Sequence, residues 1–249
     1  MGLIHKDTFV CFDCESTGLD PENDRIIEIA IASFTFDGII ESKEDLVDPA
    51  ISIPEHTIEI HHITDDMVKG KPSIKSILPE YLKIMGRHIL VGHAIPFDIS
   101  IVNNSAQRSQ INTSLSSLKY LDTLRMARLY GESPTNSLQS LRKHFNIAAH
   151  GAHRAMSDVL VNIEVFKHLS RNFKTTEQLL KRLEKPIQLK LMPLGKHKGR
   201  PFNEVPVEYL RWAARQNFDQ DLLFSIRTEL KKRKQGNLFS QVSNPFSEL

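Results

Sequence analysis

Two acidic residues on one predicted strand are the first in this chain whose types and spacing could do chemistry. Asp13 and Glu15 lie two positions apart in residues 8–15, where β-branched and aromatic side chains predict a strand. Because side chains alternate along a strand, both carboxylates point to the same face. Like charges this close repel each other, and a divalent cation between them removes the repulsion. The pair therefore suggests a Mg²⁺ or Mn²⁺ site, although two acids at the end of a surface strand would give the same pattern.

Three residues further along the chain could join such a site. Asp98 follows a short apolar segment, at the point where a loop opens a helix. His153 and Asp158 lie five positions apart at the start of another predicted helix, and this spacing does not give one helical face. We therefore place His153 on the entering loop and Asp158 in the first turns, from where both can converge on one site. Taken alone, an acid in the first turn of a helix is also an ordinary cap.

Cys11 and Cys14 flank Asp13 with the CxxC spacing of redox and zinc motifs. On a strand, however, positions 11 and 14 point to opposite faces, and the chain has no other cysteine. Packing in the core is therefore the favoured interpretation. Two cysteines in 249 residues also argue against a disulfide framework and favour a reducing, cytoplasmic environment.

The segments around these residues follow one another in the order of a known family. Residues 9–18 (FVCFDCESTG), 93–98 (HAIPFD), 121–123 (LDT) and 153–158 (HRAMSD) together resemble the DEDDh exonuclease superfamily. Its members include the proofreading epsilon subunit of bacterial DNA polymerase III, ribonuclease T and oligoribonuclease. The resemblance covers about residues 7–170, and the gap between His153 and Asp158 matches the histidine branch of the superfamily.

This resemblance implies a set of catalytic roles. Asp13, Glu15, Asp98 and Asp158 match the family residues that bind two divalent ions, Mg²⁺ or Mn²⁺, and His153 matches the general base. Asp13 would bridge both ions, Glu15 and Asp158 would hold the first, and Asp98 the second. Two ions about 3.5–4 Å apart stabilise the attacking and leaving oxygens of an in-line displacement. An imidazole with an unperturbed pKa of about 6.5 can accept the proton of the attacking water.

Six residues are expected to contact the substrate: Ser16, Thr17, Gly18, Ile60, His61 and Phe97. The first three follow the paired carboxylates and could present backbone N–H groups to the terminal nucleotide. Residues 57–64 (TIEIHHIT) resemble the family segment, usually His-Gly-Ile-Thr, that borders the 3' terminus. The aromatic ring could stack on a base, although burial at a strand–helix junction fits it equally well.

The chain departs from the family pattern at two positions. His62 stands where the family has glycine, which changes the wall beside the 3' terminus. Ala94 replaces the asparagine of the usual His-Asn-x-x-Phe-Asp motif, so neither His93 nor Ala94 is expected to be a ligand.

Hydrophobic patterning predicts the elements that must position these residues. Further strands are expected at residues 25–36 and 88–91, with a hairpin turn at Asp37-Gly38 leading into another strand. Helices are expected at residues 72–86, from residue 97 onward, and at residues 155–169. A further helix is expected to begin after a cap at Asn136-Ser137 and to end at about residue 145. Strands first, then strands alternating with helices, predict an α/β fold with a mixed sheet; the resemblance implies the ribonuclease H-like version, flanked by helices.

A change of composition near residue 185 predicts a boundary, and with the resemblance it implies three parts. These are an exonuclease domain at 1–185, a small basic α-rich domain at 187–233 and a flexible tail at 234–249. Residues 1–185 carry 21 Lys and Arg against 24 Asp and Glu, whereas residues 186–249 carry 11 against 6, a net charge of +5. Residues 192–212 resemble a small domain of unknown function that is appended to some such exonucleases. Lys196, Lys198 and Arg200 lie in its Gly-rich loop, where they could hold phosphates or form an ordinary solvated surface.

The tail suggests a partner. Residues 235–239, from Gln235 to Phe239, resemble the Gln-x-x-Leu-Phe peptides that dock on bacterial sliding clamps. DNA polymerase III subunits are a second partner class that the resemblance implies. No apolar segment approaches the length of a membrane span, and residues 1–8 lack the apolar core of a signal peptide, so we expect a cytoplasmic protein without membrane association.

The expected function is hydrolysis of single-stranded or frayed DNA from the 3' end, with release of nucleoside monophosphates, in replication proofreading or repair. Trimming of RNA 3' ends, as by ribonuclease T and oligoribonuclease, is the alternative within the same chemistry. A non-catalytic nucleic-acid-binding scaffold on the same fold is the alternative of another class. It would predict loss of a metal ligand, and all four carboxylates and His153 are present.

Overall fold

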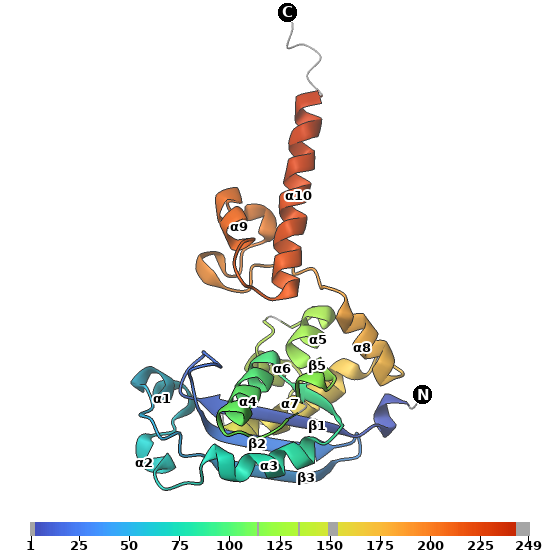
Figure 1. Cartoon of the computed structure of the whole chain (residues 1–249). Coiled ribbons are helices and arrows are strands. Elements are labelled where there is room, and N and C mark those ends of the chain that lie inside the picture. The colour runs from blue at the N-terminus through green and yellow to red at the C-terminus, as the bar shows by residue number, and fades with distance from the viewer. Residues whose placement is uncertain (1–2, 114, 134, 149–153, 243–249) are drawn as a thin grey trace, which may run out of the picture. The chain divides into compact units, whose positions relative to one another are not determined.

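The chain folds into two units, Met1–Arg182 and Leu183–Leu249, which are described separately below. The structure is a computed structural model (Figure 1). It describes residues 3–113, 115–133, 135–148 and 154–242.

A mixed five-stranded sheet forms the centre of the first unit, with strand order β3-β2-β1-β4-β5. The strands are β1 (Phe9–Ser16), β2 (Ile26–Phe34), β3 (Ile39–Leu46), β4 (Ile89–Gly92) and β5 (Tyr120–Asp122). The first three form an antiparallel meander, and β4 and β5 run parallel to β1. The carboxyl ends of β1, β4 and β5 therefore meet at one edge, which is where α/β sheets place their sites.

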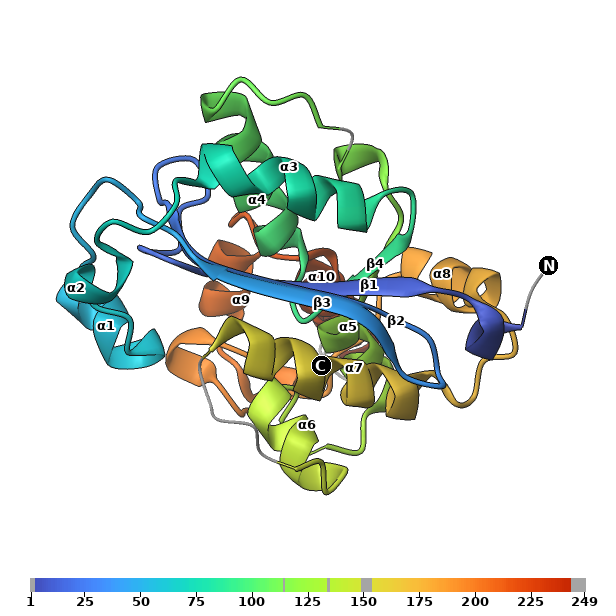
Figure 2. The same cartoon turned by 90° about the horizontal axis from the view of Figure 1, so that it is seen from below.

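Helices cover both faces of this sheet (Figure 2). On one side lie α3 (Ile74–Met85) and α4 (Pro96–Arg108), and on the other α7 (Ala155–Ser170) and α6 (Leu138–His144). The remaining helices of this unit are α1 (Glu55–His61), α2 (Asp65–Val68), α5 (Thr123–Tyr130) and α8 (Thr176–Glu184), the last of which crosses the unit boundary. Short 3-10 helices occur at Ile4–Lys6 and Leu115–Ser117.

The alternation of β1 decides which residues face which helices. Val10, Phe12 and Cys14 belong to a buried cluster with side chains of α3 and α4. The Phe9 ring packs instead on Phe166 of α7, with ring centroids 4.9 Å apart. Odd-numbered residues of β1 therefore face α7, and this is the face that carries Asp13 and Glu15.

The two cysteines point to opposite faces, as the alternation predicts. Cys14 lies in the cluster on the α3–α4 side, whereas the Cys11 thiol lies 3.8 Å from the Val159 carbonyl oxygen of α7. Both thiols are free and buried, and burial raises the pKa of each well above its usual value. Two neutral, buried thiols on opposite faces of the sheet contribute to core packing and do not form a redox or zinc pair.

The fold class predicted from the sequence is confirmed, and the predicted strands and helices are present with boundaries close to those expected. Ser137 caps α6, accepting a hydrogen bond from the Ser140 N–H. The patterning missed α1, α2, β5, α5 and α8. These missed elements have 7, 4, 3, 8 and 9 residues, respectively, and are too short for a strong periodic signal.

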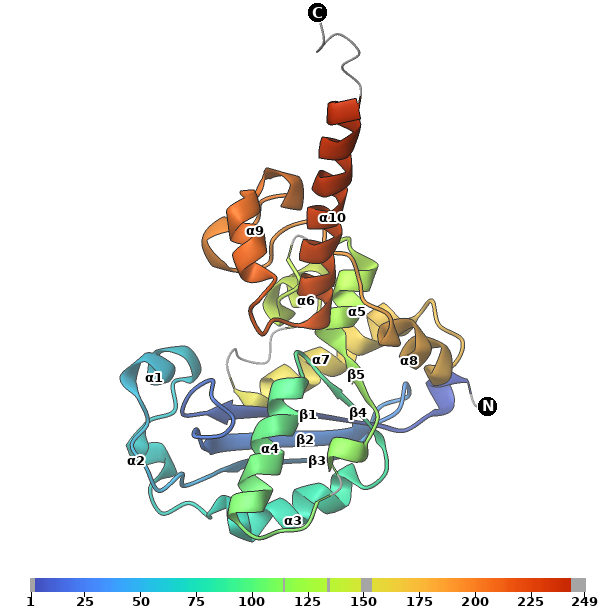
Figure 3. The ribbon, with the colours of Figure 1, turned by 45° about the horizontal axis from the view of Figure 1, so that its top comes forward.

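The second unit is built on two helices, α9 (Val207–Ala213) and α10 (Gln220–Val242), which lie side by side (Figure 3). Its buried cluster joins Met192 and Phe202 to apolar residues of both helices. Two 3-10 helices, Gly195–His197 and Phe202–Glu204, lie in the segment before α9. The sequence predicts a flexible tail from residue 234, whereas the structure continues α10 to residue 242. Among the described residues, no helix is long and apolar enough to cross a membrane, α10 included.

Both departures from the family pattern fall at residues with left-handed backbone. His62 ends α1 with φ 59°, and Ala94 in the β4–α4 loop has φ 58°. Glycine adopts this conformation freely and asparagine tolerates it, whereas other residues are strained there by roughly 1–2 kcal/mol. The family's glycine and asparagine therefore fit the backbone better than the residues present in this chain.

Replacing His62 with glycine is expected to raise the free energy of unfolding by about 1 kcal/mol, because glycine relieves the left-handed strain at the end of α1. The matched control is His56→Gly inside the same helix, which should lower it by about 0.5–1 kcal/mol. Urea unfolding of both variants checks the signs. Equal destabilisation by both changes would show that residue 62 carries no strain.

Candidate metal centre and active site

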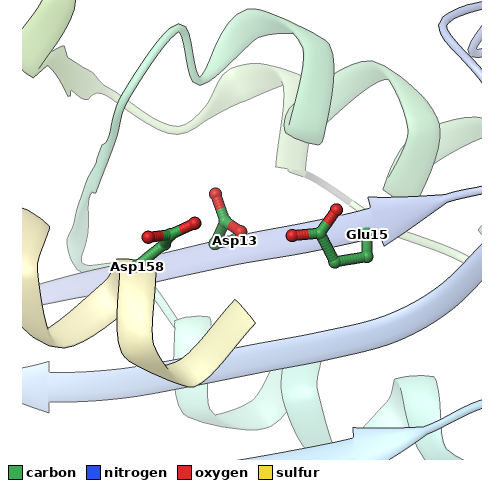
Figure 4. A group of neighbouring side chains, drawn as sticks. All are labelled: Asp13, Glu15 and Asp158. Carbon is green, nitrogen blue, oxygen red and sulfur yellow. The ribbon is translucent and has the colours of Figure 1, made fainter. Parts of the chain in front are cut away.

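Three of the predicted metal ligands converge at one end of β1. Asp13 and Glu15 project from the strand and Asp158 from the first turns of α7 (Figure 4). One carboxylate oxygen from each lies within 4.8 Å of the other two, and all three residues are half-buried. Oxygens this close, all from carboxylates, form the donor set that Mg²⁺ and Mn²⁺ prefer. The residues present therefore fit a divalent ion at this point.

The position of Asp158 depends on how α7 begins. Glu28 of β2 is fully buried opposite Glu15, and it accepts hydrogen bonds from the Ala155 N–H at 2.9 Å and from the Arg154 guanidinium at 2.9 Å. The first bond satisfies an N–H that the first turn of a helix leaves unpaired. Glu28 thus fixes the start of α7 against the sheet, and Asp158 lies one turn further along.

Burial and mutual repulsion raise the pKa values of two members of the cluster, Glu15 and Asp13. Burial raises the pKa of Glu15 to about 7, and the charges of Asp158 and Glu28 add to the effect, while Arg154 opposes it. The pKa of Asp13 is also raised well above its usual value, first by burial and then by its acidic neighbours. Such shifts mark carboxylates that are held together against their repulsion, which is the state that a cation stabilises.

Asp98 approaches the same end of the sheet from the first turn of α4. It is buried, and its Oδ1 accepts a hydrogen bond from the Cys14 N–H at 3.0 Å. Because β4 pairs with β1 only as far as Cys11, this N–H has no strand partner on that side. Burial raises the pKa of Asp98 to about 8, and the carboxylate in turn raises the pKa of Asp13. Asp98 is thus an electrostatic neighbour of the three-carboxylate cluster but is not part of it.

Polar residues at the end of β5 and the start of α5 hold the loop before α4 by hydrogen bonds. Asp122, at the end of β5, accepts hydrogen bonds from the Ala94 N–H and the Leu124 N–H, both at 2.9 Å. Thr123 lies within hydrogen-bond distance of the His93 Nδ1 and of the Asn162 side chain. Sequence reasoning noted residues 121–123 only as a motif. Their shared feature, a polar pair after a short parallel strand, is the signal that could have identified them as supports of the site.

Of the predicted substrate contacts, Thr17 is committed to internal bonds. Its N–H donates to the Arg25 carbonyl and its hydroxyl to the Asp24 carboxylate, so its amide is not presented to a nucleotide. The Ser16 hydroxyl donates to the Gly18 carbonyl. A Cβ on Gly18 would lie 2.4 Å from Asp24 Oδ2, so a larger residue would displace this carboxylate from its hydrogen bonds with Thr17 and Asp20. These three residues shape the turn after β1.

The other predicted substrate contacts differ in their exposure to solvent. Ile60 is 56% exposed, whereas His61 is buried with its Nδ1 accepting the Ile63 N–H. Phe97 is half-buried and packs against the α3–α4 cluster, which is the ordinary alternative for this ring. His153 lies outside the described residues, one position before Arg154.

Residues 10–166 match the protein family described as Exonuclease. This stretch covers more than half of the chain and contains every residue of the cluster. The chain belongs to this exonuclease family. Residues 178–231 match a second family, described as "Putative quorum-sensing-regulated virulence factor".

Relatives of this chain include proteins named as DNA polymerase III or one of its subunits. The chain is 36% identical over 167 residues to the DNA polymerase III subunit epsilon of Treponema pallidum (strain Nichols), covering 66% of this chain and 77% of that one. It is 32% identical over 169 residues to the DNA polymerase III PolC-type of Clostridium perfringens, covering 68% of this chain but 12% of the relative. The chain thus spans about an eighth of the PolC-type relatives.

Solved structures share the fold of the exonuclease. Exonuclease X in complex with 5' overhanging duplex DNA matches with TM-score 0.56 and 24% identity, over 70% of this chain and 98% of that one. E. coli Exonuclease I in complex with a dT13 oligonucleotide matches with TM-score 0.63 and 20% identity, over 72% of this chain and 44% of that one. At this identity the likeness confirms the ribonuclease H-like architecture.

Without divalent metal, the free energy of unfolding is expected to fall as pH rises from about 5 to 8. Glu15 and Asp98 have folded pKa values of about 7 and about 8, whereas both titrate near about 4 in an unfolded chain, so the folded state holds more protons across this window. Mn²⁺ should restore stability most strongly at pH 8, where it competes with fewer protons. Urea unfolding in EDTA and in MnCl₂ measures both effects. A flat profile in EDTA would contradict the raised pKa values.

Replacing Arg154 with methionine is expected to lower the free energy of unfolding by about 3 kcal/mol. The change leaves the fully buried Glu28 carboxylate without its cation, and breaking a buried pair is strongly destabilising. The double variant Glu28→Gln with Arg154→Met removes the uncompensated charge and should recover part of the loss. No difference between single and double variants, measured by urea unfolding, would refute the charge pairing.

Proposed function

We propose that this exonuclease removes nucleoside monophosphates from single-stranded or frayed 3' ends of DNA, using two divalent ions, Mg²⁺ or Mn²⁺. The observation that carries the proposal is the convergence of Asp13, Glu15 and Asp158, with Asp98 beside them, at the carboxyl ends of the parallel strands. A non-catalytic scaffold would have no reason to keep these acids in mutual repulsion.

Each carboxylate has a proposed role. Asp13, Glu15 and Asp158 would hold the first ion, and Asp13 and Asp98 the second. The ions would supply charge neutralisation at the phosphate and activation of water. His153 would accept the proton of the attacking water, a role that rests on the sequence motif. The oxygen that leaves on the shortened strand is the 3' oxygen, so each cycle exposes a new 3' end.

The DNA polymerase III relatives support DNA as the substrate. They also support association with DNA polymerase III subunits, in replication proofreading or repair in the cytoplasm. Docking of residues 235–239 on a sliding clamp is a further hypothesis. In the structure these residues form part of α10, so binding as an extended peptide would require the end of that helix to unwind. A synthetic peptide of residues 233–241 that shows no clamp binding at high micromolar concentration would reject this hypothesis.

Digestion of matched 5'-labelled single-stranded DNA and RNA oligonucleotides tests the proposal. With Mg²⁺ or Mn²⁺, the DNA should shorten in steps from its 3' end. Asp13→Asn, Asp98→Asn and Asp158→Asn should each reduce the rate by at least about 100-fold, because each removes a negative ligand while keeping the side-chain shape. The control Asp66→Asn changes an exposed acid of α2 and should retain full activity.

The sugar and the reaction direction are read from the same gel. Faster digestion of the RNA would replace DNA repair with RNA 3'-end trimming as the function. Cleavage that persists in the Asp13→Asn variant would show that the cluster is not the active site. Absence of cleavage of both substrates under both metals would favour a binding role.

A further inference from the structure

Exposed cations gather in one loop of the second unit. Lys190, Lys196, Lys198 and Arg200 are all exposed, and no acidic residue occurs from residue 186 to residue 203. No ion pair involving these four cations is found among the described residues, so their charge faces solvent. A dense cationic segment of this kind attracts a polyanion.

Backbone hydrogen bonds fix the shape of this loop. Met192 donates to the Arg200 carbonyl and Gly199 to the Met192 carbonyl, both at 2.8 Å, and Leu191 bridges to Pro201. Gly199 has φ 82°, the left-handed conformation that such a tight turn requires. The cations are therefore carried on an ordered turn and lose less freedom on binding than cations on a flexible tail.

An aromatic contact attaches the loop to α9. His197 is buried between the two exposed lysines, and its ring meets the Tyr209 ring edge-on with centroids 4.6 Å apart. The Tyr209 hydroxyl lies over Gly195, where a Cβ would approach it to 2.5 Å. Because the residue between them points inward, Lys196 and Lys198 are held on the outside of the loop.

A large exposed ring lies next to this contact. Trp212 follows Tyr209 by one helical turn, its ring centroid lies 5.2 Å from the Tyr209 ring, and its side chain is 51% exposed. Leu194 of the loop is also exposed, at 38%. The second unit thus combines a half-exposed indole with cations on an adjoining ordered loop.

We propose that Trp212 and the cations of residues 190–200 form a binding surface for single-stranded nucleic acid. Such a strand offers base faces for the indole and phosphates for the cations, and aromatic stacking within a positive surface is how proteins bind single strands without sequence preference. An acidic peptide would engage the cations but leave the indole unused. The inference rests on the proposed function only for the identity of the ligand, because the strand would be the substrate.

Trp212 is the single tryptophan of the chain, so intrinsic fluorescence reports on this surface alone. Titration of the full-length protein with an oligonucleotide dT15 in EDTA, which prevents hydrolysis, is expected to quench the tryptophan emission. Poly-glutamate of equal charge should leave the emission unchanged. Absence of quenching by dT15, or equal quenching by poly-glutamate, would overturn the proposal.

Variants measured by anisotropy of a labelled dT15 provide the second arm. Trp212→Ala should weaken binding by about tenfold, the loss of one stacked base, while Trp212→Phe should keep most of the affinity. The double change Lys196→Gln with Lys198→Gln should reduce the slope of log affinity against log salt by about 1.4. The matched control, Lys231→Gln with Lys232→Gln, removes the same charge from α10. An equal effect of the control pair would show that net charge alone binds the strand.

The two proposals fail in different experiments. Binding in EDTA needs no hydrolysis, so missing quenching with intact cleavage overturns only the second-unit surface. Intact quenching with no cleavage overturns only the proposed nuclease function.

Discussion

Repulsion among buried acids is the constraint on which the first unit depends. Asp13, Glu15 and Asp158 lie close together with Asp98 beside them, and removal from water makes the negative charges of Asp13, Glu15 and Asp98 less favourable. A fold can hold such a group only if stronger interactions decide where the backbone goes. The antiparallel meander, the aromatic packing under α7 and the hydrogen bonds of buried Glu28 provide those interactions, and none of them uses the carboxylates of the four acids.

The pattern of the sequence was informative where one physical rule governs the outcome. Alternation along β1 predicted that Asp13 and Glu15 share a face and that Cys11 and Cys14 do not, because a strand gives side chains no other choice. The same reasoning could not reveal the position of Asp98, since its approach depends on β4 ending before Cys14. Convergence of segments that are distant in sequence was inferred from a family likeness, not from spacing.

Other features could not be predicted from the sequence because they depend on which partner each polar or aromatic group meets in the folded chain. Glu28 reads as one polar interruption in an apolar strand, and its role appears only with Arg154, 126 positions later. Thr17 was predicted to contact the substrate because it follows the paired carboxylates, yet its polar groups are used by the turn with Asp24 and Arg25. In the second unit, the basic loop was visible in the sequence, but its attachment to α9 through His197 was not.

The attachment of α7 to the sheet through Glu28 also affects the order in which the chain folds during its synthesis. Strands β1 to β3 can pair as soon as the ribosome releases them, because their contacts are local in sequence. Asp158 joins them only after a further hundred or more residues have emerged, when Glu28 can receive the first turn of α7. A nascent or prematurely terminated chain therefore displays two acids on a sheet and no complete cluster. The carboxylate cluster is therefore completed late in synthesis, and a chain that ends before α7 lacks one of its three members.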